Sequence, residues 1–156
     1  MADYDEKSRS QCLEMVPRAT ATATPSATAV DLLDFGACTF EMYAGIGGIT
    51  FTTTNRIDYI VYESDDNSTF TAAGDDALIL DPGATAPGGT GIVRSLIAAK
   101  AAADTVISTV GYRGKKRYAK CVPTFGGTHG TGTPVGVTVR RGYAYHGPIG
   151  ASSIET

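Results

Sequence analysis

Two aspartates and an asparagine, Asp65, Asp66 and Asn67, are adjacent in the sequence YESDDNSTFTAAG and could bind a cation, act as a carboxylate pair or cap a turn. A calcium loop of the EF-hand type alternates its oxygen ligands and requires a glycine at its sixth position and a glutamate at its twelfth. This pattern is missing here, and adjacent side chains on an extended chain point to opposite faces. We therefore predict a turn capped by these side chains with Ser64 and Ser68, and keep surface cation binding as the alternative.

The two histidines, His129 and His146, are the other candidates for catalysis or metal binding. Neither has a cysteine or carboxylate at metal-ligand spacing, and no nucleophile lies beside either of them. The segment GGTHGTG around His129 lacks the GK[ST] ending of a phosphate-binding loop. A catalytic triad formed by residues far apart in the sequence stays open as an alternative, but no local pattern supports one. The sequence thus predicts no enzyme, no metal and no cofactor.

A basic cluster is the third group, and it holds five of the thirteen lysines and arginines: Arg113, Lys115, Lys116, Arg117 and Lys120. Basic side chains at a turn can simply keep it solvated and prevent aggregation. The functional alternative is an electrostatic contact with an acidic protein surface, or less readily with DNA phosphates. Because the whole chain has a net charge of −3, direct nucleic-acid binding is not the favoured interpretation.

The three cysteines are too few and too scattered for a disulfide framework or a zinc site. Cys38 and Cys121 lie in strand-like segments, where we expect them to be small buried residues. Cys12 lies in a segment without a core pattern. Neither a signal peptide nor an apolar run long enough for a membrane helix is apparent, so we expect folding in a cytoplasm and no membrane partner.

The elements that position these residues are predicted to be strands. The chain has 156 residues, 19 glycines and many threonines, which is typical of one all-β domain with short strands and frequent turns. Period-two alternation places Cys38, Phe40 and Met42 on one face of a strand. Strands are expected at residues 18–24, 37–43, 49–54, 57–63, around Phe70, and at 77–80 and 135–145.

Two connections are predicted in more detail. Residues 105–112 and 117–122 look like the arms of a hairpin, with Gly114 supplying a positive φ in its turn. For residues 92–103 the alanines, leucine and lysine favour a short helix or an irregular crossover.

The overall prediction is an antiparallel β-sandwich, jelly-roll-like, with an extended N-terminal arm. Residues 1–29 form the arm and an edge strand, residues 30–146 the sandwich and residues 147–156 a C-terminal tail. The arm proper, residues 1–17, is expected to be polar and flexible when alone.

Two motifs, VYESDDNSTFTAA and GYRGKKRYAKC, together resemble a family of small virion structural proteins of tailed bacteriophages. The resemblance covers roughly residues 30–122, and the chain departs from the pattern at residues 81–103 and in its N-terminal arm. Asp65, Asp66 and Asn67 match the turn of the first motif. The second motif is matched by Gly111, Tyr112, Arg113, Gly114, Lys116, Arg117 and Tyr118.

The resemblance implies a protein without catalytic residues that is assembled in the bacterial host cytoplasm and located in the virion. Within that class we expect a capsid decoration or cement protein on the head lattice, a homo-oligomer whose partners are the major capsid protein and copies of itself. The predicted contact residues are Cys12, Leu13, Met15, Arg113, Lys115, Lys116 and Arg117. Cys12 is also a candidate for an intersubunit disulfide.

Two alternatives stay open. One is a neck or tail connector or a tube-associated subunit with the same fold. The other is a glycan-binding head fibre or spike module that would stack sugars on Tyr43, Tyr59, Tyr62, Tyr143 and Tyr145.

Overall fold

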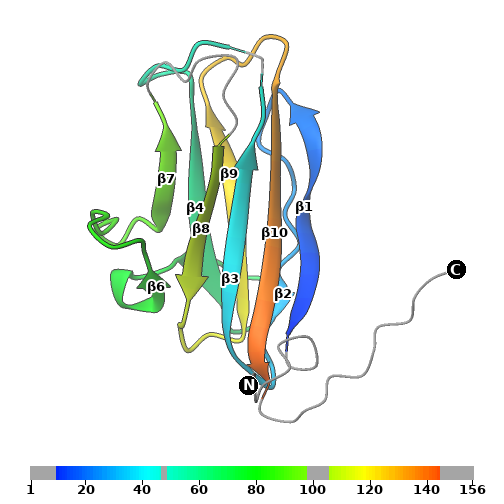
Figure 1. The fold of residues 1–156 in the computed structure, drawn as a ribbon, viewed down its shortest axis with the longest axis vertical. Coiled ribbons are helices and arrows are strands. Elements are labelled where there is room, and N and C mark those ends of the chain that lie inside the picture. Colours follow the sequence, from blue (N-terminus) through cyan, green and yellow to red (C-terminus); the bar gives the residue numbers. More distant parts are fainter. Residues whose placement is uncertain (1–9, 47–48, 98–105, 145–156) are drawn as a thin grey trace, which may run out of the picture.

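The structure, a computed structural model, describes residues 10–46, 49–97 and 106–144, without the side chains of Val106, Tyr143 and Ala144. These residues form two packed antiparallel sheets whose strands run along the long axis of the molecule (Figure 1). The first sheet contains, in spatial order, β1 (Gln11–Ala21), β10 (Thr133–Ala144), β3 (Phe35–Ala44), β8 (Val106–Tyr112) and β6 (Leu78–Ile79). The second contains β2 (Val30–Asp31), β9 (Tyr118–Gly126), β4 (Arg56–Ser64) and β5 (Thr71–Ala72), with β7 (Ile92–Leu96) also paired to β4. A short 3₁₀ helix, η1 (Asp75–Ala77), precedes β6.

The strand order is that of a jelly roll. Without the two-residue strands β5 and β6, the sheets read β1-β10-β3-β8 and β2-β9-β4-β7. Among these eight strands, every step along the chain except β4 to β7 changes sheet. This pattern of two interleaved Greek keys defines the double-sheet jelly roll. The predicted all-β sandwich is therefore confirmed.

The core lies between the sheets and follows the predicted alternation. Cys38, Phe40 and Met42 of β3 are buried, while the residues between them are only half-buried. Strand β4 and strand β10 contribute inward residues in the same way: Ile57, Tyr59, Val61, Val135, Val137 and Val139. Cys121 is also buried, so both cysteines predicted to be internal are part of the core.

The predicted hairpin at residues 105–122 is wrong. Strands β8 and β9 belong to different sheets, and residues 113–117 cross from one sheet to the other at the lower end of Figure 1. Gly114 is not among the described glycines with a positive φ. Its backbone instead lies against a buried ring, because a Cβ at this position would be 2.2 Å from Tyr112 Oη. We call residues 113–117 the basic arch.

The N-terminal arm is shorter than predicted. Strand β1 begins at Gln11 rather than near Arg18 and pairs with β10, so residues 11–17 are part of the sandwich. Met15 and Val16 are buried in the core, and register shifts occur between Glu14 and Val16 and between Val16 and Ala19. Such irregularities and a proline are common on edge strands, where they discourage further pairing. Residues 1–9 lie outside the described part.

Two further expectations are corrected. The predicted strand at residues 49–54 is wrong, because residues 49–55 form no strand. Thr52 Oγ1 accepts a hydrogen bond from Asn55 N at 2.9 Å, as in a polar turn. Residues 92–96 are strand β7 rather than a helix, since pairing with β4 outweighs the weak local helix preference. Residues 98–103, and the predicted C-terminal tail at 147–156, lie outside the described residues.

Candidate protein-docking site

The acidic segment is a turn, as predicted. Asp66 Oδ1 accepts hydrogen bonds from Thr69 N at 2.8 Å, Ser68 N at 2.9 Å and Ser64 Oγ at 2.8 Å. The backbone bond from Thr69, followed by those from Ser68 and Ser64, holds the pKa of Asp66 well below its usual range. Asn67 takes a left-handed conformation with φ of 58°, which asparagine tolerates. The carboxylate of Asp66 therefore serves the backbone of the turn.

This turn and the basic arch are adjacent, although they are far apart in the sequence. Lys116 forms an ion pair with Asp65, 51 residues away. One residue before the arch, the buried Tyr112 donates a hydrogen bond through its hydroxyl to Glu63 Oε2 at 2.8 Å. The two contacts connect the end of β4 in one sheet to the end of β8 in the other.

Arg117 leaves the arch in another direction and pairs with Asp31 of β2. Its Nε and NH2 groups donate to Asp31 Oδ1 and Oδ2 at 3.0 and 2.7 Å, which is the two-point geometry of a guanidinium and a carboxylate. The hydrogen bond from Arg117 is the main reason that the pKa of Asp31 is lowered. Like Lys116, Arg117 is thus neutralised within the chain.

Arg113 and Lys115 differ from these two cations. Arg113 Nε donates to the backbone carbonyl of Asp76 at 3.2 Å, an acceptor without a net charge. Lys115 is exposed, and neither side chain has an ion-pair partner among the described residues. Lys120 lies outside the arch, on β9, with its Nζ 3.8 Å from the centre of the Phe70 ring. Within the described part of the chain, the predicted cluster of five therefore contains two cations, Arg113 and Lys115, without a charged or aromatic partner.

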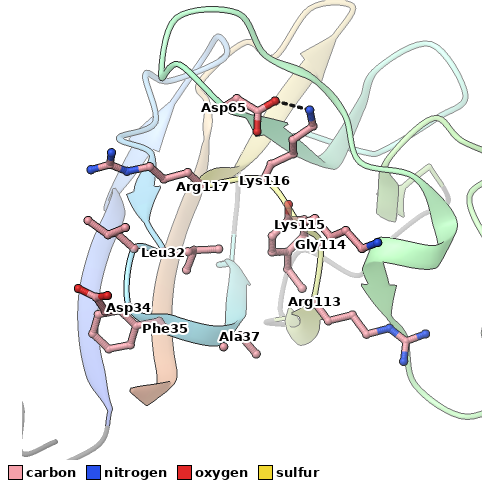
Figure 2. A pocket seen from close by; sticks show the side chains of 13 residues that line it. Leu32, Asp34, Phe35, Ala37, Asp65, Arg113, Gly114, Lys115, Lys116 and Arg117 are labelled. Carbon is pink, nitrogen blue, oxygen red and sulfur yellow. Dashed lines mark hydrogen bonds and ion pairs between the residues drawn. The ribbon is translucent and has the colours of Figure 1, made fainter. Parts of the chain in front are cut away.

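A cavity of about 540 Å³ lies between the basic arch and the segment that leads into β3 (Figure 2). It is lined by residues 32–37, Asp65 and residues 112–117. Leu32 is buried and Phe35 half-buried, whereas 55% of Leu33 is exposed. The cavity thus combines apolar surface with charged groups. The sequence analysis did not predict that residues 32–37 line a cavity, because Asp34 and Phe35 form no recognisable motif.

The predicted N-terminal contact residues do not belong to this site. Strand β1 is separated from β8 by β10 and β3. Met15 is only 2% exposed, and its Sδ accepts a hydrogen bond from Cys121 N at 3.0 Å, so it is a core residue rather than a contact residue. Leu13 is half-buried against the same core, and Cys12 alone of the three is exposed.

The remaining candidates are buried or packed against neighbouring side chains where they are described. His129 is buried with its ring edge-on to Phe125 at 4.5 Å, and its Nε2 lies 2.8 Å from Gly126 O. Tyr59 is buried and donates its hydroxyl hydrogen to Tyr43 O at 2.5 Å, so it cannot stack on a sugar. The Arg18 guanidinium lies 4.7 Å from the centre of the Tyr43 ring. The side chain of Tyr143, and both Tyr145 and His146, lie outside the described part.

Comparisons with protein-family models, curated proteins and solved structures found no match for this chain. Within residues 10–46, 49–97 and 106–144, no helix is long and apolar enough to cross a membrane. In the same residues, no group of three or more histidine, cysteine or acidic side chains is arranged to hold a metal ion.

Proposed function

We propose that this chain is a structural protein of a tailed-phage virion, and specifically a decoration or cement protein on the head lattice. The observation that carries the proposal is that the two motifs of the family resemblance form one unit. Lys116 of the second motif pairs with Asp65 of the first, and Tyr112 bonds to Glu63. Because residues of the two motifs contact each other, we treat the motifs as one feature rather than as two separate weak similarities.

The jelly-roll fold supports the proposal by analogy. Viral capsid proteins use this fold, but lectins and other proteins use it too, so it does not determine the function. A rigid sandwich with an exposed basic arch suits repeated docking on a lattice, where several modest contacts add up to firm attachment. The partners in this proposal are the major capsid protein and other copies of this chain, which acts as a homo-oligomer in the particle.

Two alternatives differ in how well the geometry supports them. A neck or tail connector would use the same fold and the same arch, so copy number distinguishes it from a decoration protein. The glycan-binding alternative loses Tyr59, which is buried. Of the described candidates it keeps the half-buried Tyr43 and Tyr62, together with the fold analogy with lectins.

The test is the number of copies per particle, from quantitative mass spectrometry of purified virions with the major capsid protein as internal reference. A copy number comparable to that of the capsid protein is expected. A small fixed number, as in a closed ring, would assign the chain to the neck or tail instead. Absence from the particle would contradict any virion role.

A further inference from the structure

We infer that Arg113 and Lys115 bind the carboxylates of an extended acidic segment of a partner protein, whose apolar side chains contact Leu33 and Phe35 in the cavity beside the basic arch. The chemistry of the segment follows from the cavity itself. Only its identification as part of the major capsid protein rests on the proposed function.

The first step is the distribution of charge around the cavity. Lys116 and Arg117 are neutralised by Asp65 and Asp31. Asp34 also acts on Arg117, because its charge helps to raise the pKa of that guanidinium. Figure 2 shows Arg113 and Lys115 extending toward one side of the cavity and Arg117 toward the opposite side. Among the described residues that line the cavity, the positive charge without a carboxylate partner therefore belongs to Arg113 and Lys115.

The second step is the orientation of Arg113. Its Nε bond to the Asp76 carbonyl directs the guanidinium without neutralising it. The two terminal nitrogens of the group remain as donors, and their planar fork matches a carboxylate at two points. Because this side chain is already held in place, less conformational entropy is lost when a partner binds.

The third step is the apolar side of the cavity. Leu33 is more than half exposed, and Phe35 is half-buried, with the Arg141 guanidinium 4.2 Å from the centre of its ring. Successive side chains of an extended segment point in opposite directions. A segment that alternates acidic and apolar residues can thus place carboxylates near Arg113 and Lys115 and apolar groups on Leu33 and Phe35.

The same charges favour a protein over a nucleic acid as the partner. Asp34 lines the cavity without an ion-pair partner among the described residues, and its charge would repel a continuous line of phosphates. The net charge of −3 acts in the same direction. A short segment with two or three carboxylates requires positive charge only at the Arg113 and Lys115 side.

The experiment is a titration of the full chain into a fluorescein-labelled peptide Ser-Leu-Glu-Val-Asp-Leu-Ser, followed by fluorescence anisotropy. Saturable binding is expected, and Lys115→Gln and Arg113→Gln should each weaken it about tenfold. The matched control is Arg94→Gln, which removes an exposed arginine from β7 and should change the affinity by less than about twofold. The amide peptide Ser-Leu-Gln-Val-Asn-Leu-Ser should not bind.

Several outcomes would overturn the inference. These are no saturable binding, an equal loss with Arg94→Gln, or equally strong competition by single-stranded DNA. A concentration-dependent dimer of the chain that Lys115→Gln abolishes would show that the occupant is a second copy. Circular dichroism of each variant verifies that it is folded. Peptide binding by a chain that is absent from virions would support this inference and reject the proposed function. A chain that is present in virions but does not bind the peptide would reject this inference and leave the proposed function in place.

Discussion

The hydroxyl of Tyr112 donates a hydrogen bond to Glu63 at 2.8 Å and thereby joins the two sheets of the sandwich near the basic arch. Tyr112 belongs to β8 and Glu63 to β4, and the tyrosine ring is fully buried. Burial, and secondly the carboxylate of Glu63, raise the pKa of Tyr112 well above its usual range. The neutral hydroxyl therefore remains a donor across the physiological pH range.

The first prediction concerns this bond. Tyr112→Phe should lower the free energy of unfolding by about 1–2 kcal/mol, because it leaves a half-buried carboxylate without its donor. Urea denaturation measures the change. Tyr62→Phe is the matched control, since Tyr62 has no side-chain hydrogen bond within the described residues; its effect should stay within about 0.5 kcal/mol. Equal effects of the two variants would show that the Tyr112 bond contributes nothing.

Gly114 provides the second prediction. A Cβ at this position would lie 2.2 Å from Oη and 2.3 Å from Cζ of the Tyr112 ring, and that ring is buried and cannot easily move. Gly114→Ala should therefore destabilise the protein by about 1–3 kcal/mol. Gly142→Ala serves as the control, because a Cβ there would meet nothing within 4 Å. A neutral Gly114→Ala would mean that the arch can move away from the ring.

The third prediction concerns how the free energy of unfolding depends on pH. The hydrogen bond from Arg117 lowers the pKa of Asp31, so the folded state favours the deprotonated carboxylate. The resulting stabilisation is present above the unfolded pKa of about 3.9 and is lost as the pH falls through the lower folded value. Asp31→Asn should therefore lower stability at neutral pH and reduce the loss between about pH 7 and pH 3.

Urea unfolding at both pH values measures this effect. Asp81→Asn is the control, since the exposed Asp81 side chain has no partner among the residues described. If Asp31→Asn lost as much stability in acid as the wild type, the Asp31–Arg117 pair would not contribute to acid sensitivity.

The fourth prediction concerns the thiols. Cys12 is exposed on β1, whereas Cys38 and Cys121 are buried, and burial raises the pKa of the Cys38 thiol to about 12. Because the thiolate is the reactive form, the native chain should react with one equivalent of Ellman's reagent, and the chain in guanidinium with three. Cys12→Ser should abolish the native reaction. A second fast thiol in the native chain would contradict the burial of Cys38 or Cys121.

The exposure of Cys12 is compatible with the intersubunit disulfide for which the sequence makes it a candidate. If it forms in released particles, a non-reducing gel of virions should show a dimer band that disappears with reductant and in the Cys12→Ser variant. A gel with monomer alone would exclude the disulfide.

Local patterns were sufficient to predict the class of fold and much of the core. Alternation in β3 identified its buried face correctly, because a strand that contacts a core on one side must repeat its apolar residues with a period of two. The turn at Asp66 was also predictable, since its hydrogen bonds join residues only two or three positions apart.

The partners of each strand were decided only by the tertiary structure. Alternation shows which face of a strand is buried but not which strand lies beside it, so the step from β8 to β9 looked like a hairpin although it crosses between sheets. Met15 looked like part of a polar arm because its contact with Cys121 spans 106 residues. Likewise, five basic residues looked equivalent in the sequence. Their roles differ because the jelly roll brings Asp65 to Lys116 and Asp31 to Arg117, and leaves Arg113 and Lys115 without a carboxylate in the described part of the chain.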